Sequence, residues 1–131
     1  MEINSQLLEQ LLQEALSSER LRVSFDLRTT PDDQSQRMLN ALQPGTVLPI
    51  HRHPMTSETL VILNGCLDEV FFDDEGHETQ RMHIDAAQGV YGCNIPRGTW
   101  HTIEVLEPTV IIEAKDGPYS PMASEFFDTT N

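Results

Sequence analysis

After residue 37 the sequence consists mostly of short segments in which apolar and polar residues alternate. Turn signals such as Pro44-Gly45 and Asn64-Gly65 separate these segments roughly every 8–12 residues. Asn-Gly is a strong hairpin signal, because both residues tolerate a positive φ angle. A series of short, half-buried segments favours a β-sandwich or a closed barrel, since either arrangement buries one face of each strand. We therefore expect an all-β fold.

The length of the chain suits one domain, with a different kind of segment at each end. We expect a helical segment at residues 1–19, a single barrel at residues 20–115 and an irregular tail at residues 116–131. The tail can fold across the mouth of the barrel or against another subunit. The strands expected in the barrel span residues 21–28, 37–42, 46–53, 58–63, 66–72, 78–84, 91–95, 99–106 and 109–114.

Residues 4–17 form the only helix that the sequence predicts, because leucines recur there at helical spacing. Asn4 or Ser5 can cap its N-terminus. We expect the apolar stripe of this helix to pack on the outside of the barrel, and contact with a second subunit is the alternative. A homodimer would also protect an edge strand of the barrel.

The charge of the chain argues against two classes of partner. It carries 21 acidic and 8 basic residues, for a net charge of −13, whereas nucleic acids and anionic membranes attract a basic face. We see no secretory signal and no apolar run of the roughly 18 residues that span a bilayer. Cys66 and Cys93 do not make a disulfide framework. We expect a cytoplasmic protein whose partner is a small molecule.

Four residues have the chemistry and spacing of metal ligands. His51, His53 and Glu58 lie within residues 45–65, and His101 comes much later. Residues i and i+2 of a strand project to the same face, so the first two imidazoles point together. A carboxylate inside an apolar barrel is unfavourable unless it is paired or binds a metal. Three imidazoles and one carboxylate suit one divalent transition metal ion, namely Zn, Fe, Mn, Ni or Co.

The spacing of these ligands resembles that of the cupin superfamily. Residues 45–65 match its first motif, G-x5-HxH-x4-E-x6-G, and residues 89–101 match its second motif, which ends in Pro-x-Gly-x-x-His. The second motif has one extra residue in its spacer, and Val105 replaces an asparagine found in many cupins. The resemblance implies a small double-stranded β-helix (cupin, jelly-roll) barrel that holds the metal through His51, His53, Glu58 and His101.

A closer resemblance is to the WbuC family of cupin-fold metalloproteins. It is carried by residues 31–42, 44–54, 72–76 and 117–119. That family is associated with bacterial O-antigen and surface-polysaccharide gene clusters. The resemblance implies a small polar metabolite as the ligand, such as a sugar intermediate of polysaccharide synthesis.

Four further residues are candidates for work beside the metal. Arg37 can point inward and hold a carboxylate or phosphate through its guanidinium fork, or it can form a salt bridge with one of the 21 acidic residues. Lys115 is a second candidate for substrate binding. Glu113 and Tyr119 are candidates for acid–base catalysis, although most glutamates at strand ends are only solvated.

These features leave three functions open. A metal-dependent isomerase, lyase or hydrolase would polarise a carbonyl or hydroxyl group of the metabolite. An Fe(II) oxygenase uses the same ligand set. A non-catalytic module for metal-dependent binding or sensing would need no acid or base beside the metal.

Overall fold

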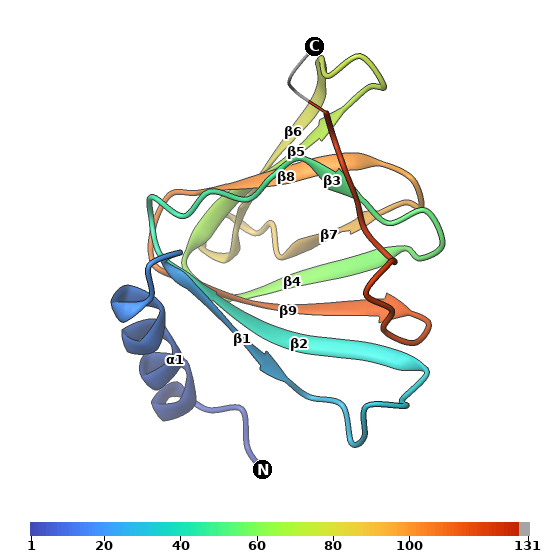
Figure 1. Ribbon diagram of the computed structural model, residues 1–131. Coiled ribbons are helices and arrows are strands. Elements are labelled where there is room, and N and C mark those ends of the chain that lie inside the picture. The colour runs from blue at the N-terminus through green and yellow to red at the C-terminus, as the bar shows by residue number, and fades with distance from the viewer. Residues whose placement is uncertain (129–131) are drawn as a thin grey trace.

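Two five-stranded sheets face each other in the computed structural model, which describes residues 1–128 (Figure 1). The strand order is β1-β2-β9-β4-β7 in one sheet and β10-β3-β8-β5-β6 in the other, with antiparallel pairing throughout. The predicted all-β barrel is confirmed. The strands are β1 (Arg22–Asp26), β2 (Ser35–Leu42), β3 (His51–Arg52), β4 (Glu58–Asn64), β5 (Cys66–Phe72), β6 (Glu78–Asp85), β7 (Gly92–Ile95), β8 (Trp100–Val105), β9 (Thr109–Asp116) and β10 (Glu125–Phe126).

The bounds of most predicted strands shift by one or two residues, and two strands differ more. The strand expected at residues 46–53 shrinks to β3, and Pro49, which lacks an N–H group, lies in the irregular segment before it. The tail contains β10, whose Phe126 pairs with His51 of β3. A strand of two residues is too short to show an alternating pattern, so the sequence did not predict β10. Residues 129–131 of the predicted tail lie outside the described residues.

The helix α1 (Ser5–Ser17) forms where the leucine pattern predicts it. The side chain of Asn4 caps its start by accepting a hydrogen bond from the N–H of Leu7 at 3.0 Å. Leu11 and Ala15 pack against the outer face of the sheet at Leu39. Among residues 1–128, no helix has both the length and the apolar character needed to cross a membrane.

The space between the sheets is apolar in one half and polar in the other. The apolar half is a cluster of buried aliphatic side chains: Leu42, Leu60, Ile62, Leu67, Ile84 and Ile111. On β4 the same inward-facing row continues from Leu60 to Glu58, because alternate residues share a face. On β8 it passes from Ile103 to His101. The polar half therefore begins where the apolar cluster ends.

Candidate metal centre and its cavity

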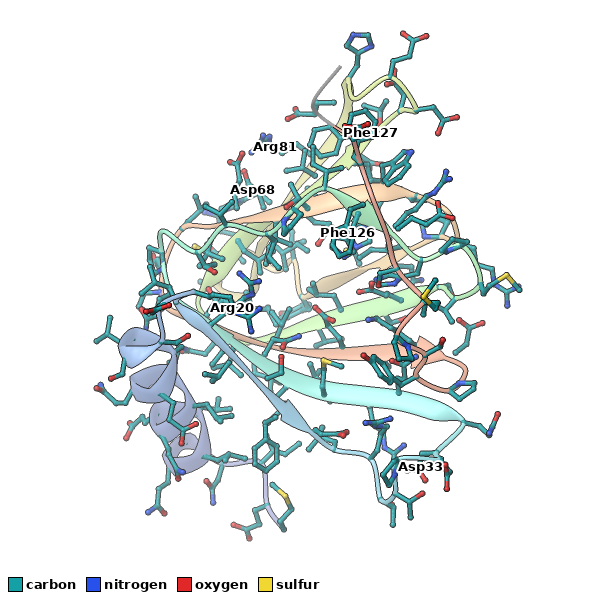
Figure 2. All side chains as sticks on the ribbon, viewed as in Figure 1. Arg20, Asp33, Asp68, Arg81, Phe126 and Phe127 are labelled. Atoms are coloured by element: carbon teal, nitrogen blue, oxygen red, sulfur yellow. The ribbon has the colours of Figure 1, made fainter. Side chains whose placement is uncertain are left out.

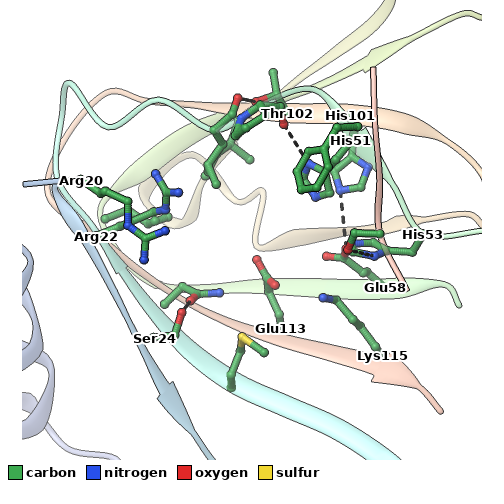
Figure 3. A pocket seen from close by; sticks show the side chains of 18 residues that line it. Arg20, Arg22, Ser24, His51, His53, Glu58, His101, Thr102, Glu113 and Lys115 are labelled. Carbon is green, nitrogen blue, oxygen red and sulfur yellow. Dashed lines mark hydrogen bonds and ion pairs between the residues drawn. The ribbon is translucent and has the colours of Figure 1, made fainter. Parts of the chain in front are cut away.

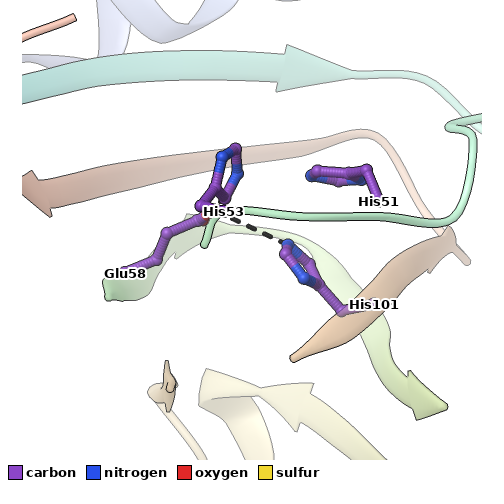
Figure 4. Close-up of side chains that lie close together, drawn as sticks. All are labelled: His51, His53, Glu58 and His101. Atoms are coloured by element: carbon purple, nitrogen blue, oxygen red, sulfur yellow. Dashed lines mark ion pairs between the residues drawn. The ribbon is translucent and has the colours of Figure 1, made fainter. Parts of the chain in front are cut away.

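The four predicted ligands meet between the two sheets (Figure 4). His51 of β3 pairs in register with His101 of β8, His53 follows β3, and Glu58 begins β4 in the facing sheet. One ligand atom from each lies within 4.8 Å of the others. The fold thus brings together the residues that the two motifs separate in sequence.

Each imidazole ring of the site is held through its Nδ1 atom. The partners, at 2.9–3.1 Å, are Pro49 O for His51, Thr99 O for His101 and Ser124 Oγ for His53. A carbonyl oxygen only accepts, so His51 and His101 carry their proton on Nδ1 when neutral. Their Nε2 atoms keep a free lone pair, which is the arrangement that orients histidine for a metal.

The contact between His53 and Glu58 shows that these residues fit a metal. His53 Nε2 lies 2.7 Å from Glu58 Oε1, and His101 Nε2 lies 3.5 Å from the same oxygen. His53 and Glu58 are 6% and 4% exposed, yet His53 Nε2 has no partner with hydrogen-bond geometry within residues 1–128. A buried nitrogen without a partner is unfavourable. A divalent cation beside this nitrogen would satisfy it together with the carboxylate.

The protonation states of the site also suit a cation. Burial, together with the nearby His101, lowers the pKa of His51 to about 4, so its ring is neutral at physiological pH. Burial tends to raise the pKa of Glu58, but the contacts with His101 and His53 outweigh it and hold that pKa well below its usual range. A neutral imidazole and an ionised carboxylate are the metal-binding forms of these side chains.

The ligands line one side of a cavity of about 460 Å³ (Figure 3). Arg20 and Arg22 point into it from the opposite side, Glu113 lies between the two groups, and Lys115 lies beside Glu58. A cavity of this volume accommodates a small metabolite. The cavity therefore combines the metal ligands with both acidic and basic groups.

Two of the weaker sequence candidates lie in this cavity. Glu113 and Lys115 share one face of β9, and Lys115 is opposite Glu58 in register. Burial and the charge of Glu58 raise the pKa of Glu113 to about 7. Glu113 can therefore take up or release a proton near neutral pH.

The other two candidates lie elsewhere. Arg37 shares the face of β2 with Leu39, which packs against α1, so it points away from the barrel interior and pairs with Asp33 at 3.3 Å. This is the salt bridge that the sequence left open as the alternative. Tyr119 is 58% exposed and lines a separate hollow of about 210 Å³, where Arg28 lies over its ring. Neither residue lines the main cavity.

Sequence reasoning did not single out Arg20, Arg22, Ser124 or Glu69. Alternation in residues 21–28 puts Arg22 and Ser24 on one face, but only the position of α1 shows which face is inward. Ser124 reaches His53 from a tail without a motif.

Glu69 of β5 is fully buried, and neither of its oxygens has a hydrogen-bond partner among the described residues. Burial, and then the charges of Glu58 and Glu113, raise its pKa to about 9. The alternating pattern of β5 gave no sign that this position, rather than Asp68, faces inward.

Comparison with known proteins agrees with this architecture. CapF, a capsular polysaccharide assembling protein from Staphylococcus aureus, superposes with a TM-score of 0.71 at 22% identity, over 86% of this chain and 31% of CapF. Oxalate decarboxylase from Lactobacillus farciminis superposes with a TM-score of 0.62 at 18% identity, over 80% of this chain and 30% of the enzyme. SPY1581, a conserved protein of unknown function from Streptococcus pyogenes, superposes with a TM-score of 0.60 at 14% identity, over 79% of this chain and 80% of SPY1581.

These identities show the fold alone, and this chain spans less than a third of CapF and of oxalate decarboxylase. No curated protein matches the sequence. Residues 3–84 match the family described as "Domain of unknown function (DUF6016)". The chain is thus a small cupin barrel and belongs to the DUF6016 family.

Proposed function

We propose that the protein is a metal-dependent cupin enzyme that acts on a small polar metabolite. The observation that carries this proposal is the convergence of three oriented imidazoles and one carboxylate on a cavity that also contains Glu113. The buried Nε2 of His53, which lies against Glu58 but has no partner with hydrogen-bond geometry within residues 1–128, supports a resident cation. Four protein ligands leave positions open on an octahedral ion, and open positions are typical of catalytic rather than structural sites.

The chemistry follows from the groups around the cavity. A divalent metal would polarise a carbonyl or hydroxyl group of the metabolite, as isomerases, lyases and hydrolases require. Glu113, whose pKa is about 7, supplies a group that can move a proton to or from the metabolite. Its presence favours catalysis over a purely binding or sensing role. The apolar cluster behind the site excludes water from the inner side.

Finer assignments are also proposed. The resemblance to the WbuC family supports a sugar intermediate of bacterial surface-polysaccharide (O-antigen) synthesis as the metabolite. The fold similarity to a capsular polysaccharide assembling protein points the same way. The acidic charge argues against nucleic-acid and membrane partners, and the two free cysteines support a cytoplasmic protein. The exposed Leu16 at the end of α1 supports a homodimer.

Elemental analysis of untagged protein tests the metal. We expect stoichiometric Zn, Fe, Mn, Ni or Co in the wild type and none in a His51→Ala/His101→Ala variant that remains folded by circular dichroism. A His77→Ala variant is the control, because this histidine is exposed and outside the cavity. The proposal fails if the wild type holds no metal or if the site variant retains it. Iron in the wild type would direct the next assay to oxygen-dependent turnover.

A further inference from the structure

The basic side chains of the protein fall into two groups according to their partners. Every arginine outside the main cavity has a carboxylate oxygen at 2.6–3.3 Å: Arg28, Arg37, Arg52, Arg81 and Arg97. Arg20, Arg22 and Lys115 line the cavity, and within residues 1–128 none of them forms an ion pair with a carboxylate. Figure 2 shows the contrast, with Arg81 and Asp68 on the outer surface and Arg20 between the sheets.

This division is not explained by a shortage of acidic partners, because the chain has 21 acidic residues and only 8 basic ones. All five arginines outside the cavity have found a carboxylate partner. Two neighbouring arginines without such a partner repel each other. Burial, and then the charge of Arg20, lower the pKa of Arg22. An anion between the two guanidinium groups would relieve that repulsion.

The position of the two arginines leaves their donors available. Arg22 Nη1 donates a hydrogen bond to the carbonyl oxygen of Val47 at 2.9 Å, which fixes the side chain but uses only part of its fork. The guanidinium groups of Arg20 and Arg22 point into the cavity, on the side away from the imidazoles (Figure 3). Guanidinium forks bind carboxylate and phosphate groups through paired hydrogen bonds.

We propose that Arg20 and Arg22 bind the carboxylate or phosphate group of an anionic metabolite whose polar end faces the metal centre. This inference rests on the proposed function, because the metal centre provides the second point of attachment. The anion belongs on the arginine side, because the guanidinium groups of Arg20 and Arg22 point into the cavity there and pair with no carboxylate within residues 1–128. Lys115, which lies opposite Glu58 in register, is the third basic group of the cavity and stands at the metal end. The cavity therefore selects a small molecule that is charged at one end.

The test uses three probes that share a glycerol-like skeleton: glycerate, glycerol 3-phosphate and uncharged glycerol. We would titrate each into metal-loaded and metal-stripped protein and follow binding by NMR. Both anions are expected to bind and glycerol is not, and the preference between the anions identifies carboxylate or phosphate as the recognised group. In an Arg20→Gln/Arg22→Gln variant the affinity for the preferred anion should fall on the order of tenfold or more.

An Arg81→Gln/Arg97→Gln variant is the matched control, because it also removes two positive charges, but from residues outside the cavity. The inference is overturned if both double variants weaken binding equally, if the cavity variant binds like wild type, or if glycerol binds as well as the anions. Arginine-dependent binding that persists in protein without metal would support the inference even if the proposed metal function failed. Anion binding that needs only the metal would overturn the inference and leave the proposed function standing.

Discussion

The apolar half and the polar half of the barrel interior are built from the same strands, but the first stabilises the fold and the second holds the candidate metal ligands. In β4, β8 and β9 the inward-facing row passes from polar to apolar residues, as in Glu58–Leu60–Ile62, His101–Ile103–Val105 and Lys115–Glu113–Ile111. These strands run antiparallel to their neighbours through both halves, so the contrast lies in the side chains. Burial of aliphatic groups stabilises the fold, at about 1.5–3 kcal/mol for a fully buried leucine. Buried polar groups without partners destabilise it. Stability and chemistry are therefore separated along each strand.

The largest effect on stability is expected in the apolar half. Leu67 is fully buried in the aliphatic cluster, so Leu67→Ala should lower the free energy of unfolding by about 2–5 kcal/mol through lost burial and a cavity. The metal content should stay that of the wild type. Urea unfolding and elemental analysis check the two expectations. Leu106→Ala, at a position that is 48% exposed, should change little. A folded Leu67→Ala protein without metal would show that the halves are not separate.

The next effect concerns Glu69, a carboxyl group in the interior whose pKa is raised to about 9 from an ordinary value of 4.5. Between these two pKa values the folded protein keeps a proton on Glu69 that the unfolded chain loses. The stabilisation that depends on this proton is therefore complete below the ordinary pKa and disappears as the pH rises toward 9. The unfolding free energy should fall by about 1.4 kcal/mol per pH unit in between.

Glu69→Gln has nearly the same shape but does not titrate, so it isolates this contribution. The difference in unfolding free energy between wild type and variant should shift by about 2.7 kcal/mol between roughly pH 6 and pH 8. Denaturant titrations at several pH values measure it. A difference that is independent of pH would mean that Glu69 ionises normally in the folded protein.

A smaller effect is expected from Ser124, which contacts Nδ1 of His53 from the C-terminal tail. Ser124→Ala removes a group that orients a ligand, and such changes weaken metal binding about 10–100-fold. Competition with a chelator measures this affinity. Ser120→Ala is the control, because Ser120 lies in the same tail and outside the cavity. Equal affinities in the two variants would show that the tail does not support the metal.

The smallest effect is expected at the surface pair Arg97–Asp116, whose side chains are 61% and 49% exposed. Solvent screens such pairs, so Arg97→Gln should leave unfolding within experimental error of wild type. Metal content and anion binding should also be unchanged. A clear loss of either would show that this face of the protein communicates with the cavity.

Features that depend on local spacing could be predicted from the residues alone. Alternating residues and turn signals predicted the strand series, and the leucine repeat predicted α1, because side-chain period follows directly from backbone geometry. The ligand set could be read from two short motifs for the same reason. Where the pattern is short it predicted less: the bounds of β3 were wrong, and β10 was not predicted.

The face of each strand that points inward, and the residues that lie across the cavity, depend on how the helix and the two sheets pack. Arg37 and Arg22 both occur in alternating segments, yet α1 covers the face that carries Arg37 and leaves Arg22 facing the cavity. Ser124 meets His53, and Glu69 comes near Glu58, only after distant strands have packed. Alternation divides the side chains of a strand between two faces but does not show which face points inward. That choice belongs to the packing of the helix and the two sheets, which no local pattern contains.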